Sequence, residues 1–198
     1  MSLAQMISKL ATLSVCALSL SPGDVSTPAA SGRAWHTDTI TQAQTQTVTV
    51  KIDRLLPSAF PGLPAGIVRE LERRGCTIPQ VTIEGVDTKK PHNVASGEFA
   101  RKGQKDWAVL CSRRGRSAIH IFWGRPAKCA SVIESQTDSA DRYIGTADAK
   151  YILDHYESYG GPKPPPLTHE GINDGIAEKA SQVLYCYGGK WRVLQGAD

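Results

Sequence analysis

The segment spanning residues 93–123 constrains the fold more strongly than any other part of the chain, because it contains two runs in which apolar positions recur every second residue. These runs cover residues 107–111 and 118–123. Successive side chains of a strand point to opposite faces of a sheet, so both runs indicate half-buried strands. The polar residues between them, 112–117, include Gly115 and predict a hairpin with a longer loop.

A pattern of glycine, aromatic and acidic residues surrounds the start of the first run. The positions that carry it are Gly97, Phe99, Gly103, Asp106, Ala108 and Val109. They resemble the FG-GAP (VCBS-type) repeat, a β-propeller blade motif whose loop oxygens often bind calcium. A propeller needs about four blades or more, and the pattern occurs once. The resemblance therefore implies a single blade-like hairpin unit.

The loop of this motif departs from the calcium-binding pattern. Glu98 stands in place of the first aspartate, and Ala100, Arg101 and Lys102 occupy positions where oxygen donors are needed. Calcium takes about six to eight oxygen ligands, and two fixed positive charges oppose its binding. We therefore expect no metal in this loop, with Arg101 or Lys102 beside Glu98 or Asp106.

The N-terminus carries the pattern of a secretory signal peptide. Lys9 precedes an apolar run over residues 10–20, which is about as long as a signal-peptide core and shorter than the ~20 residues that span a bilayer. We expect a signal peptide over residues 1–19, cleaved after Ser19, with a site near Ala30 as the alternative. Cys16 suggests a lipoprotein, but Val15 stands where lipidation requires a small residue. The protein is then periplasmic or secreted, and its mature part has no transmembrane segment.

The remaining chain is long enough for one domain. Residues 20–47 are rich in Ser, Thr, Gln, Ala and Pro and lack apolar periodicity, which predicts a flexible leader. Residues 48–198 form the predicted domain, beginning with a strand at 48–52. A chain of 198 residues, 40% of them hydrophobic, suffices for one ordinary core.

Local signals predict two helices and a second hairpin. A helix is expected over residues 65–74, ended by Gly75, and another begins near Lys150 and ends before Gly160. Gly188-Gly189 lies between two apolar runs and predicts a tight hairpin turn, because both turn positions tolerate positive φ. The sequence thus predicts an α+β domain in which a small, mostly antiparallel sheet built from the two hairpins is covered by two short helices.

Several short segments resemble a family of uncharacterised exported bacterial proteins. They are residues 75–80, 178–181, 189–191 and 196–198, together with Tyr185. The resemblance spans most of the mature chain and implies no known activity.

Four cysteines remain once Cys16 is removed with the signal peptide. An even number in an exported chain favours two disulfides, for which three connectivities exist. We favour Cys76 with Cys111, because these cysteines flank apolar segments expected to pack together. We favour Cys129 with Cys186, because this pair would tie the C-terminal hairpin to the loop after Trp123. A zinc site is the rival interpretation, but the cysteines lack the close spacing usual in structural zinc sites.

One group of residues contains the imidazole and carboxylate side chains that acid/base catalysis uses. His169-Glu170 superficially matches a helical zinc-protease motif, but Asn173 stands where the second histidine is required. His169, Glu170 and Asp174 could instead form an acid/base cluster, since imidazole and carboxylate are suitable groups. The alternative is a loop capped by Asp and Asn turns. No nucleophile elbow, phosphate loop or dinucleotide fingerprint occurs in the sequence, so no cofactor is predicted.

Positive charge is concentrated in residues 101–128. They hold eight Lys or Arg and one acid, a net charge of +7, whereas the whole chain carries +4, so the remainder carries −3. Such asymmetry can mark a surface for polyanions, and the candidates are Arg101, Lys102, Arg113, Arg114 and Arg116. The alternative is a solvated basic rim, because the nearby aromatics Trp107, Phe122 and Trp123 lie on predicted strands and are expected in the core.

Two functions follow from these observations. The first is a non-catalytic binding or envelope-associated protein whose partner is a polyanion or another envelope component. The second is a small exported hydrolase that uses His169, Glu170 and Asp174. Convergence of these three side chains in one pocket would favour the hydrolase, because chemistry requires convergence and a turn does not.

Overall fold

The computed structural model describes residues 52–81, 90–134 and 137–198. These residues belong to one compact unit. The expected signal peptide (1–19), the leader (20–47) and most of the strand expected at 48–52 lie outside the described residues. No helix in the described part of the chain is long and apolar enough to cross a membrane.

The described part of the domain contains ten strands, two α-helices and one short 3-10 helix. The helices are η1 (Pro57–Ala59), α1 (Ala65–Arg73) and α2 (Ala149–Tyr159). The strands are β1 (Arg54–Leu55), β2 (Ile78–Pro79), β3 (Val94–Gly97), β4 (Asp106–Arg113), β5 (Arg116–Phe122), β6 (Val132–Glu134), β7 (Arg142–Ala147), β8 (Gly171–Ile176), β9 (Ala180–Tyr187) and β10 (Lys190–Gln195). This composition and the antiparallel pairing of the strands confirm the predicted α+β class.

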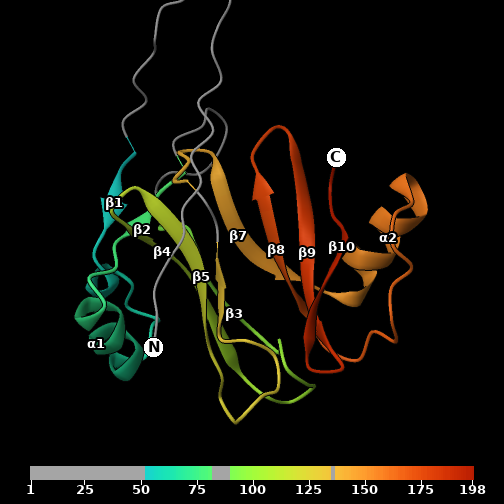
Figure 1. Cartoon of the computed structure of the whole chain (residues 1–198), viewed down its shortest axis with the longest axis horizontal. Helices are drawn as coiled ribbons and strands as arrows, with labels where there is room; N and C mark the ends of the chain where they lie inside the picture. Colours follow the sequence, from blue (N-terminus) through green and yellow to red (C-terminus); the bar gives the residue numbers. More distant parts are fainter. Residues whose placement is uncertain (1–51, 82–89, 135–136) are drawn as a thin grey trace, which may run out of the picture. The chain divides into compact units, whose positions relative to one another are not determined.

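The strands form two four-stranded sheets rather than one. The first sheet has the order β3-β4-β5-β6 and the second the order β10-β9-β8-β7, while β1 and β2 form a separate two-stranded ribbon. Figure 1 shows the helices at the two sides, α1 next to the first sheet and α2 next to the second. The domain is therefore built of four layers: α1, first sheet, second sheet and α2.

The core residues account for this layering. Those that pack between the two sheets are Ala95, Phe99, Ala108, Leu110, Ile119, Ile121, Ile144, Ile172 and Leu184. On the outer face of the first sheet, Val109 and Cys111 pack against Leu71 of α1. On the outer face of the second sheet, Tyr185 packs against Ile152 of α2. Each sheet is thus covered on both faces.

Local capping explains where the helices begin and end. α1 ends at Arg73, and Gly75 follows its C-cap residue with a φ of 70° that favours glycine, while the Cys76 N–H donates to the Leu71 carbonyl. The side chain of Asp148 caps α2 by accepting a hydrogen bond from the Tyr151 N–H, and Gly160 follows the last turn with φ 76°. Both predicted helices are confirmed, each to within a residue of the expected limits.

The turn of the central hairpin is tighter than predicted. The ladder between β4 and β5 continues to Arg113 opposite Arg116, so only Arg114 and Gly115 form the turn. Both have positive φ, 53° and 74°, as in the two-residue turns that match strand twist. The expectation of a longer loop over 112–117 is wrong because Arg114 adopts a left-handed conformation that non-glycine residues adopt rarely. The predicted Gly188-Gly189 turn is confirmed, since Tyr187 lies opposite Lys190.

Two strands of the second sheet were not recognisable from the sequence. β7 lies in a polar region without a clear pattern, and β8 contains Asn173, Asp174 and two glycines, which are poor strand formers. β8 is nevertheless paired on both sides, and Gly175 is needed because a Cβ there would lie 2.7 Å from the ring of Tyr143. Long-range pairing overrides local preference in this strand.

A buried asparagine connects the two sheets. Asn93, 2% exposed and with φ 72°, precedes β3. Its Nδ2 donates to the carbonyl oxygens of Pro79 (2.7 Å) and Arg142 (3.1 Å), and its Oδ1 accepts from the Ile144 N–H (2.9 Å). One side chain therefore links β2, the start of β3 and β7 at the edge where the sheets meet.

The two disulfides have the pairing favoured by the sequence analysis. Cys76 joins Cys111, which fastens the end of α1 to β4, and Cys129 joins Cys186, which fastens the segment after β5 to β9. Disulfides of this kind are typical of oxidising compartments.

Candidate anion-binding site

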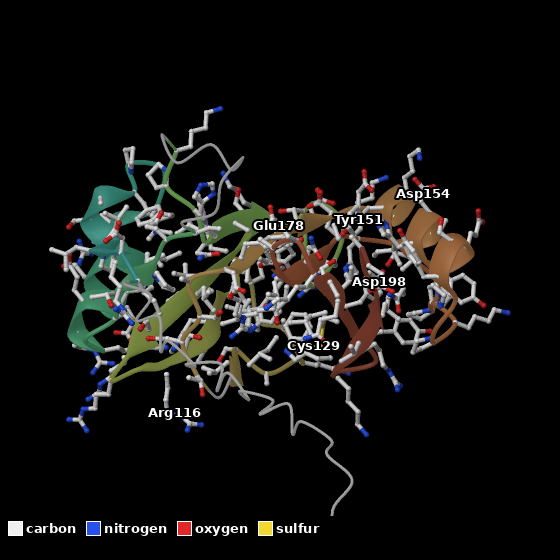
Figure 2. All side chains as sticks on the ribbon, turned by 90° about the horizontal axis from the view of Figure 1, so that it is seen from above. Arg116, Cys129, Tyr151, Asp154, Glu178 and Asp198 are labelled. Carbon is white, nitrogen blue, oxygen red and sulfur yellow. A yellow bond between two sulfur atoms is a disulfide. The ribbon has the colours of Figure 1, made fainter. Side chains whose placement is uncertain are left out.

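Three arginines lie at the tip of the central hairpin. The tight turn places Arg113, Arg114 and Arg116 within four residues, and all three are exposed. Figure 2 shows Arg116 on the side of the domain away from Asp154 of α2. Among the described residues, nothing covers these three side chains.

The arginines at the tip have no acidic partner among the described residues. Asp138 lies nearby, since its N–H donates to the Gly115 carbonyl (3.1 Å), but its carboxylate accepts from Arg54 and Ser112. In the described part of the chain, no hydrogen bond or ion pair engages the side chains of Arg113, Arg114 or Arg116. Arg113 and Arg116 are direct cross-strand partners. Like charges directly opposite each other destabilise a sheet. A bound anion would remove this repulsion.

A pocket of about 290 Å³ lies beside the tip, on the outer face of the first sheet. Its charged and polar lining consists of Arg74, Arg113, Arg116, Ser117 and His120, and the Cys76–Cys111 disulfide and Ala118 complete it. Arg113 extends over the end of α1, since its Nε lies 3.9 Å from the position that a Gly75 Cβ would occupy. The pocket thus combines the hairpin tip with the C-terminal end of α1.

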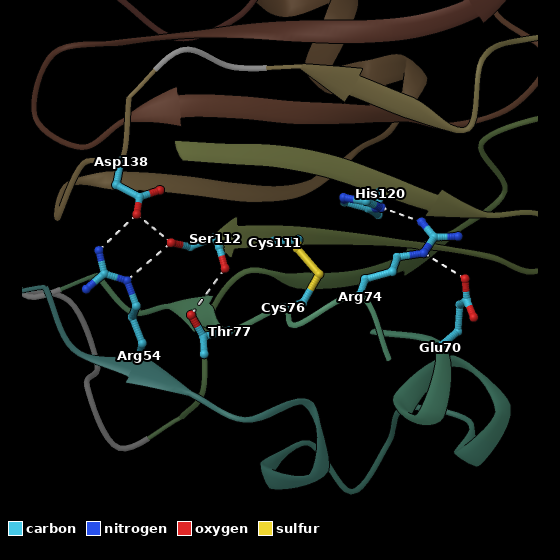
Figure 3. The surroundings of a disulfide bond; sticks show 9 residues. All are labelled: Arg54, Glu70, Arg74, Cys76, Thr77, Cys111, Ser112, His120 and Asp138. Atoms are coloured by element: carbon cyan, nitrogen blue, oxygen red, sulfur yellow. Dashed lines mark hydrogen bonds and ion pairs between the residues drawn. A yellow bond between two sulfur atoms is a disulfide. The ribbon is translucent and has the colours of Figure 1, made fainter. Parts of the chain in front are cut away.

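Arg74 is held in place from two sides, as Figure 3 shows. Its Nε donates to Glu70 Oε1 (2.7 Å), and its Nη1 lies 2.7 Å from His120 Nδ1. An arginine has no acceptor, so His120 Nδ1 must accept this hydrogen bond and the ring carries its proton on Nε2. Burial of the ring and the positive charge of Arg74 lower the pKa of His120. His120 is therefore a neutral ring that positions Arg74.

Glu70 anchors the other side of Arg74. It also accepts two hydrogen bonds from Arg73, each 2.8 Å long. Hydrogen bonds from Arg73 and Arg74 lower the pKa of Glu70 to about 2. Glu70 stays ionised at neutral pH, and this group of one acid and two arginines keeps a net positive charge.

Two further links fix the end of α1 against β4. The Cys76–Cys111 disulfide is one, and the other is a pair of backbone hydrogen bonds between Thr77 and Ser112, 3.0 and 2.7 Å long. Figure 3 shows the disulfide close to the Arg74–His120 pair. These links set the distance between Arg74 and the hairpin tip.

The disulfide also bears on metal binding. Cys76, Cys111 and His120 are the one group of three or more His, Cys, Asp or Glu side chains within the described ranges whose ligand atoms lie close enough for a metal, within 4.8 Å of one another. Because the two sulfurs are joined to each other, they offer no thiolate. The pocket is therefore suited to an anion rather than to a cation.

Arg101 and Lys102, the other two predicted polyanion residues, do not belong to this site. They lie in the turn before β4, whereas Arg113 ends β4, and a strand of eight residues spans about 23 Å. Nη2 of Arg101 donates to the Pro126 carbonyl (2.8 Å). The structure thus divides the predicted group of five between the two ends of the first sheet.

The carboxylate of Asp106, in the segment that resembles the FG-GAP repeat, accepts hydrogen bonds from three N–H groups. Asp106 is fully buried, and its oxygens accept from Gln104 Nε2 (2.7 Å), the Gly124 N–H (2.8 Å) and the Ala100 N–H (3.0 Å). The expectation that Arg101 or Lys102 lies beside Asp106 or Glu98 is not met, because these backbone and amide groups already satisfy Asp106. Its carboxylate orders the loop before β4.

The candidate catalytic residues do not converge. His169 stacks on Tyr185 with ring centroids 4.3 Å apart, and its Nδ1 and Nε2 lie 2.9 and 3.0 Å from the backbone carbonyl oxygens of Glu170 and Cys186. Glu170 Oε2 accepts from the Glu98 N–H (2.8 Å). Neither ring nitrogen of His169 is free for a metal or a substrate.

Asp174 has a different environment. It lies within β8, where Nε and Nη2 of Arg142 donate to its two oxygens at 2.8 and 2.9 Å, and Gln182 donates at 3.3 Å. Both members of this ion pair are about 9% exposed, so the pair is largely buried, and it lies at the wall of a pocket of about 670 Å³. The expectation of a capped loop is also wrong here, because residues 171–176 form a central strand.

The aromatic residues near the basic segment belong to the core, as expected. Trp107 and Phe122 pack against the α1 side of the first sheet, and Trp123 packs between the sheets and stacks on Trp191 with centroids 5.8 Å apart. Lys105 lies over the Trp107 ring at 5.0 Å. These half-buried rings therefore stabilise the fold, and their exposed parts line a pocket of about 660 Å³.

Arg74 and His120 are the site residues that sequence reasoning missed. The signal that could have identified Arg74 is the favoured disulfide. Cys76 is two residues after Arg74, and Cys111 is two residues before Arg113, so this pairing brings the two arginines to the same region. No protein-family model, curated protein or solved structure matched the chain when it was compared with them, so the interpretation of this site depends on its own geometry.

Proposed function

We propose that the protein is an exported, non-catalytic binding protein that holds a polyanion at the tip of its central hairpin. The observation that carries the proposal is the charge of Arg113, Arg114 and Arg116 at the hairpin tip, which no acidic side chain pairs in the described part of the chain. Arg113 and Arg116 lie opposite each other, and such a pair of like charges destabilises a sheet. An anionic ligand would supply the missing partner.

The expected compartment fits such a ligand. The pattern at residues 1–19 predicts export, and two disulfides are typical of an extracellular or periplasmic protein. Anionic envelope polymers and released nucleic acid are polyanions of this environment. An envelope-associated binding role therefore follows more directly than a cytosolic one.

The hydrolase alternative has no comparable support. His169 faces two carbonyl oxygens, Glu170 accepts from the backbone and Asp174 is saturated by Arg142, so the three groups have separate structural partners. A general base requires a free position within hydrogen-bond reach of its substrate.

The test is retention of the protein on heparin resin across a salt gradient. A variant with Arg113, Arg114 and Arg116 all replaced by Ser should elute at clearly lower salt than the wild type. Each lost contact should reduce the slope of log affinity against log salt by roughly 0.7–0.9, as for nucleic-acid phosphates. The melting temperature should change little, because exposed charges contribute little to stability.

A control variant separates a defined site from net charge. Replacing Lys163, Lys190 and Arg192 by Ser removes the same charge from exposed positions on the C-terminal half of the domain. We expect it to elute close to the wild type. Equal losses in both triple variants, or elution of all three proteins at the same low salt, would show that the hairpin tip is not a binding site.

A further inference from the structure

The pocket beside the hairpin tip has the dimensions of a site for one small group. Its volume of about 290 Å³ lies at the lower end of the roughly 300–1,000 Å³ typical of small-molecule sites. α1 borders it on one side and the β4–β5 tip on another, while Ala118 and the disulfide form part of its wall. Such a space is large enough for a single anionic group.

Three guanidinium groups from separate parts of the fold line this space. Arg113 and Arg116 come from adjacent strands and Arg74 from the end of α1. Glu70 and His120 engage Nε and Nη1 of Arg74, and within the described residues no partner engages its Nη2. Arg74 therefore keeps N–H groups available on a guanidinium that is already held in position, which reduces the entropy lost on binding.

The shape and charge of the lining discriminate between anions. A carboxylate has two oxygens and one charge, and a single bidentate arginine satisfies it. A phosphodiester also has two free oxygens and one charge, and its chain continues in both directions. A phosphomonoester ends in three free oxygens with a charge of about −1.5 to −2 near neutral pH. Of these three groups, the monoester offers the most oxygens and the highest charge to the three guanidinium groups from one end.

We infer that the pocket lined by Arg74, Arg113 and Arg116 binds a terminal phosphate group, a phosphomonoester, of the anionic ligand. This inference rests on the proposed polyanion binding and specifies the group of that ligand that is recognised. The hairpin tip supplies long-range attraction through Arg114 and its neighbours, and the pocket selects a chain end or a pendant phosphate. His120 acts as a positioning residue because it holds Arg74 without adding charge.

Isothermal titration calorimetry of the full chain can test the inference with four probes. Glucose 6-phosphate represents a phosphomonoester, inorganic phosphate the free ion, dimethyl phosphate a diester, and glucose the uncharged control. We expect glucose 6-phosphate to bind roughly tenfold or more tightly than dimethyl phosphate, since charge-assisted hydrogen bonds to a third oxygen are among the stronger polar contacts. Inorganic phosphate binding as tightly as glucose 6-phosphate would assign the site to the free ion and would overturn the inference of an ester.

Single variants locate the binding to the pocket. Arg74→Gln should weaken glucose 6-phosphate binding roughly tenfold or more. Arg69→Gln, which removes an exposed arginine of the same helix that does not line the pocket, should leave the affinity within about twofold of wild type. Arg116→Gln provides a second pocket variant if Arg74→Gln does not fold. Equal affinity in the wild type and both pocket variants would overturn the inference.

Heparin retention separates this inference from the proposed function. If Arg74→Gln loses phosphomonoester binding but stays on heparin, and the hairpin triple variant leaves heparin early, both proposals hold. If the wild type is retained by heparin but no probe binds, the phosphate pocket is refuted while polyanion binding stands. If glucose 6-phosphate binds but heparin retention is the same in the wild type and the triple variant, the pocket stands and the polyanion proposal fails.

Discussion

Replacement of Asn93 by Ala should destabilise the domain more than any surface change discussed above. The side chain of Asn93 satisfies three buried backbone groups: the carbonyls of Pro79 and Arg142 and the N–H of Ile144. Alanine leaves all three without that partner. The substitution also places alanine, which adopts the left-handed region less readily than asparagine does, at φ 72°.

The magnitude follows from these contacts. The Pro79 carbonyl keeps a hydrogen bond from Gln80 Nε2 (3.2 Å), so two groups lose this partner without a side-chain replacement. Leaving a buried polar group unsatisfied costs about 1–3 kcal/mol, and two groups at about 1–1.5 kcal/mol each give about 2–3 kcal/mol. The left-handed conformation adds about 1–2 kcal/mol for alanine. The expected loss is roughly 4 kcal/mol, a large part of the ~5–15 kcal/mol by which domains are usually stable.

Urea unfolding at neutral pH with the disulfides intact measures this loss. With a slope of about 2 kcal/mol/M, the midpoint should fall by about 2 M. Asn93→Gly loses the same hydrogen bonds, but glycine adopts positive φ without strain. It should therefore be less destabilised than Asn93→Ala by about 1 kcal/mol. As a control, Asn173→Ala at a similarly buried position whose Oδ1 has no partner in the described part of the chain should cost less. A loss below about 0.5 kcal/mol for Asn93→Ala would refute the reasoning.

The remaining predictions concern cysteine pairing, calcium and pH. Peptide mapping without reduction should recover two cross-links, each worth about 4 kcal/mol for loops of 35 and 57 residues, and four alkylatable thiols would contradict this. The cross-links expected are Cys76–Cys111 and Cys129–Cys186. Millimolar calcium should leave the melting temperature unchanged, because Asp106 is already satisfied by N–H donors; a rise that is lost in Arg101→Ala would show that the loop binds the ion. Folding lowers the pKa of His120 below its ordinary value of 6.5. As the pH falls below about 6.5, the unfolded chain therefore binds a proton that the folded protein does not yet bind. The free energy of unfolding should decrease over this range until the pH passes the lower pKa of the folded state. His120→Asn, which keeps an acceptor for Arg74 and does not titrate, should lose less stability between pH 7 and 5; equal losses would mean that His120 is not the group responsible.

The contrast between predicted and missed features follows the range of the interactions that form them. The helices α1 and α2, the two hairpins and the β9–β10 turn were predictable because periodicity, glycine placement and capping act over a few residues. The favoured disulfide pairing was predictable because it joined apolar segments that had to pack together. The charge concentration in residues 101–128 was also visible in the sequence.

The second sheet was not predictable in this way. β8 contains Asn173, Asp174 and two glycines, yet it is a central strand because β7 and β9 pair with it and Arg142 neutralises Asp174. Strand formation at such a segment depends on partners far away in the sequence. The hydrolase hypothesis arose from the same residues, whose chemistry suggested a site while their tertiary contacts are structural.

The amino-acid sequence by itself thus determined the class of the fold, the two helices, the two hairpins and the concentration of basic residues at the central hairpin, and it favoured the cysteine pairing that the structure has. The tertiary structure alone decided that there are two sheets, that Arg101 and Lys102 lie apart from the hairpin tip, and that Arg74 and His120 lie beside it. The physical reason is the range of the interactions. A charge cluster or a strand pattern depends on residues close together in the sequence. A pocket forms only where the folded chain brings distant side chains, such as Arg74 and Arg113, to the same place.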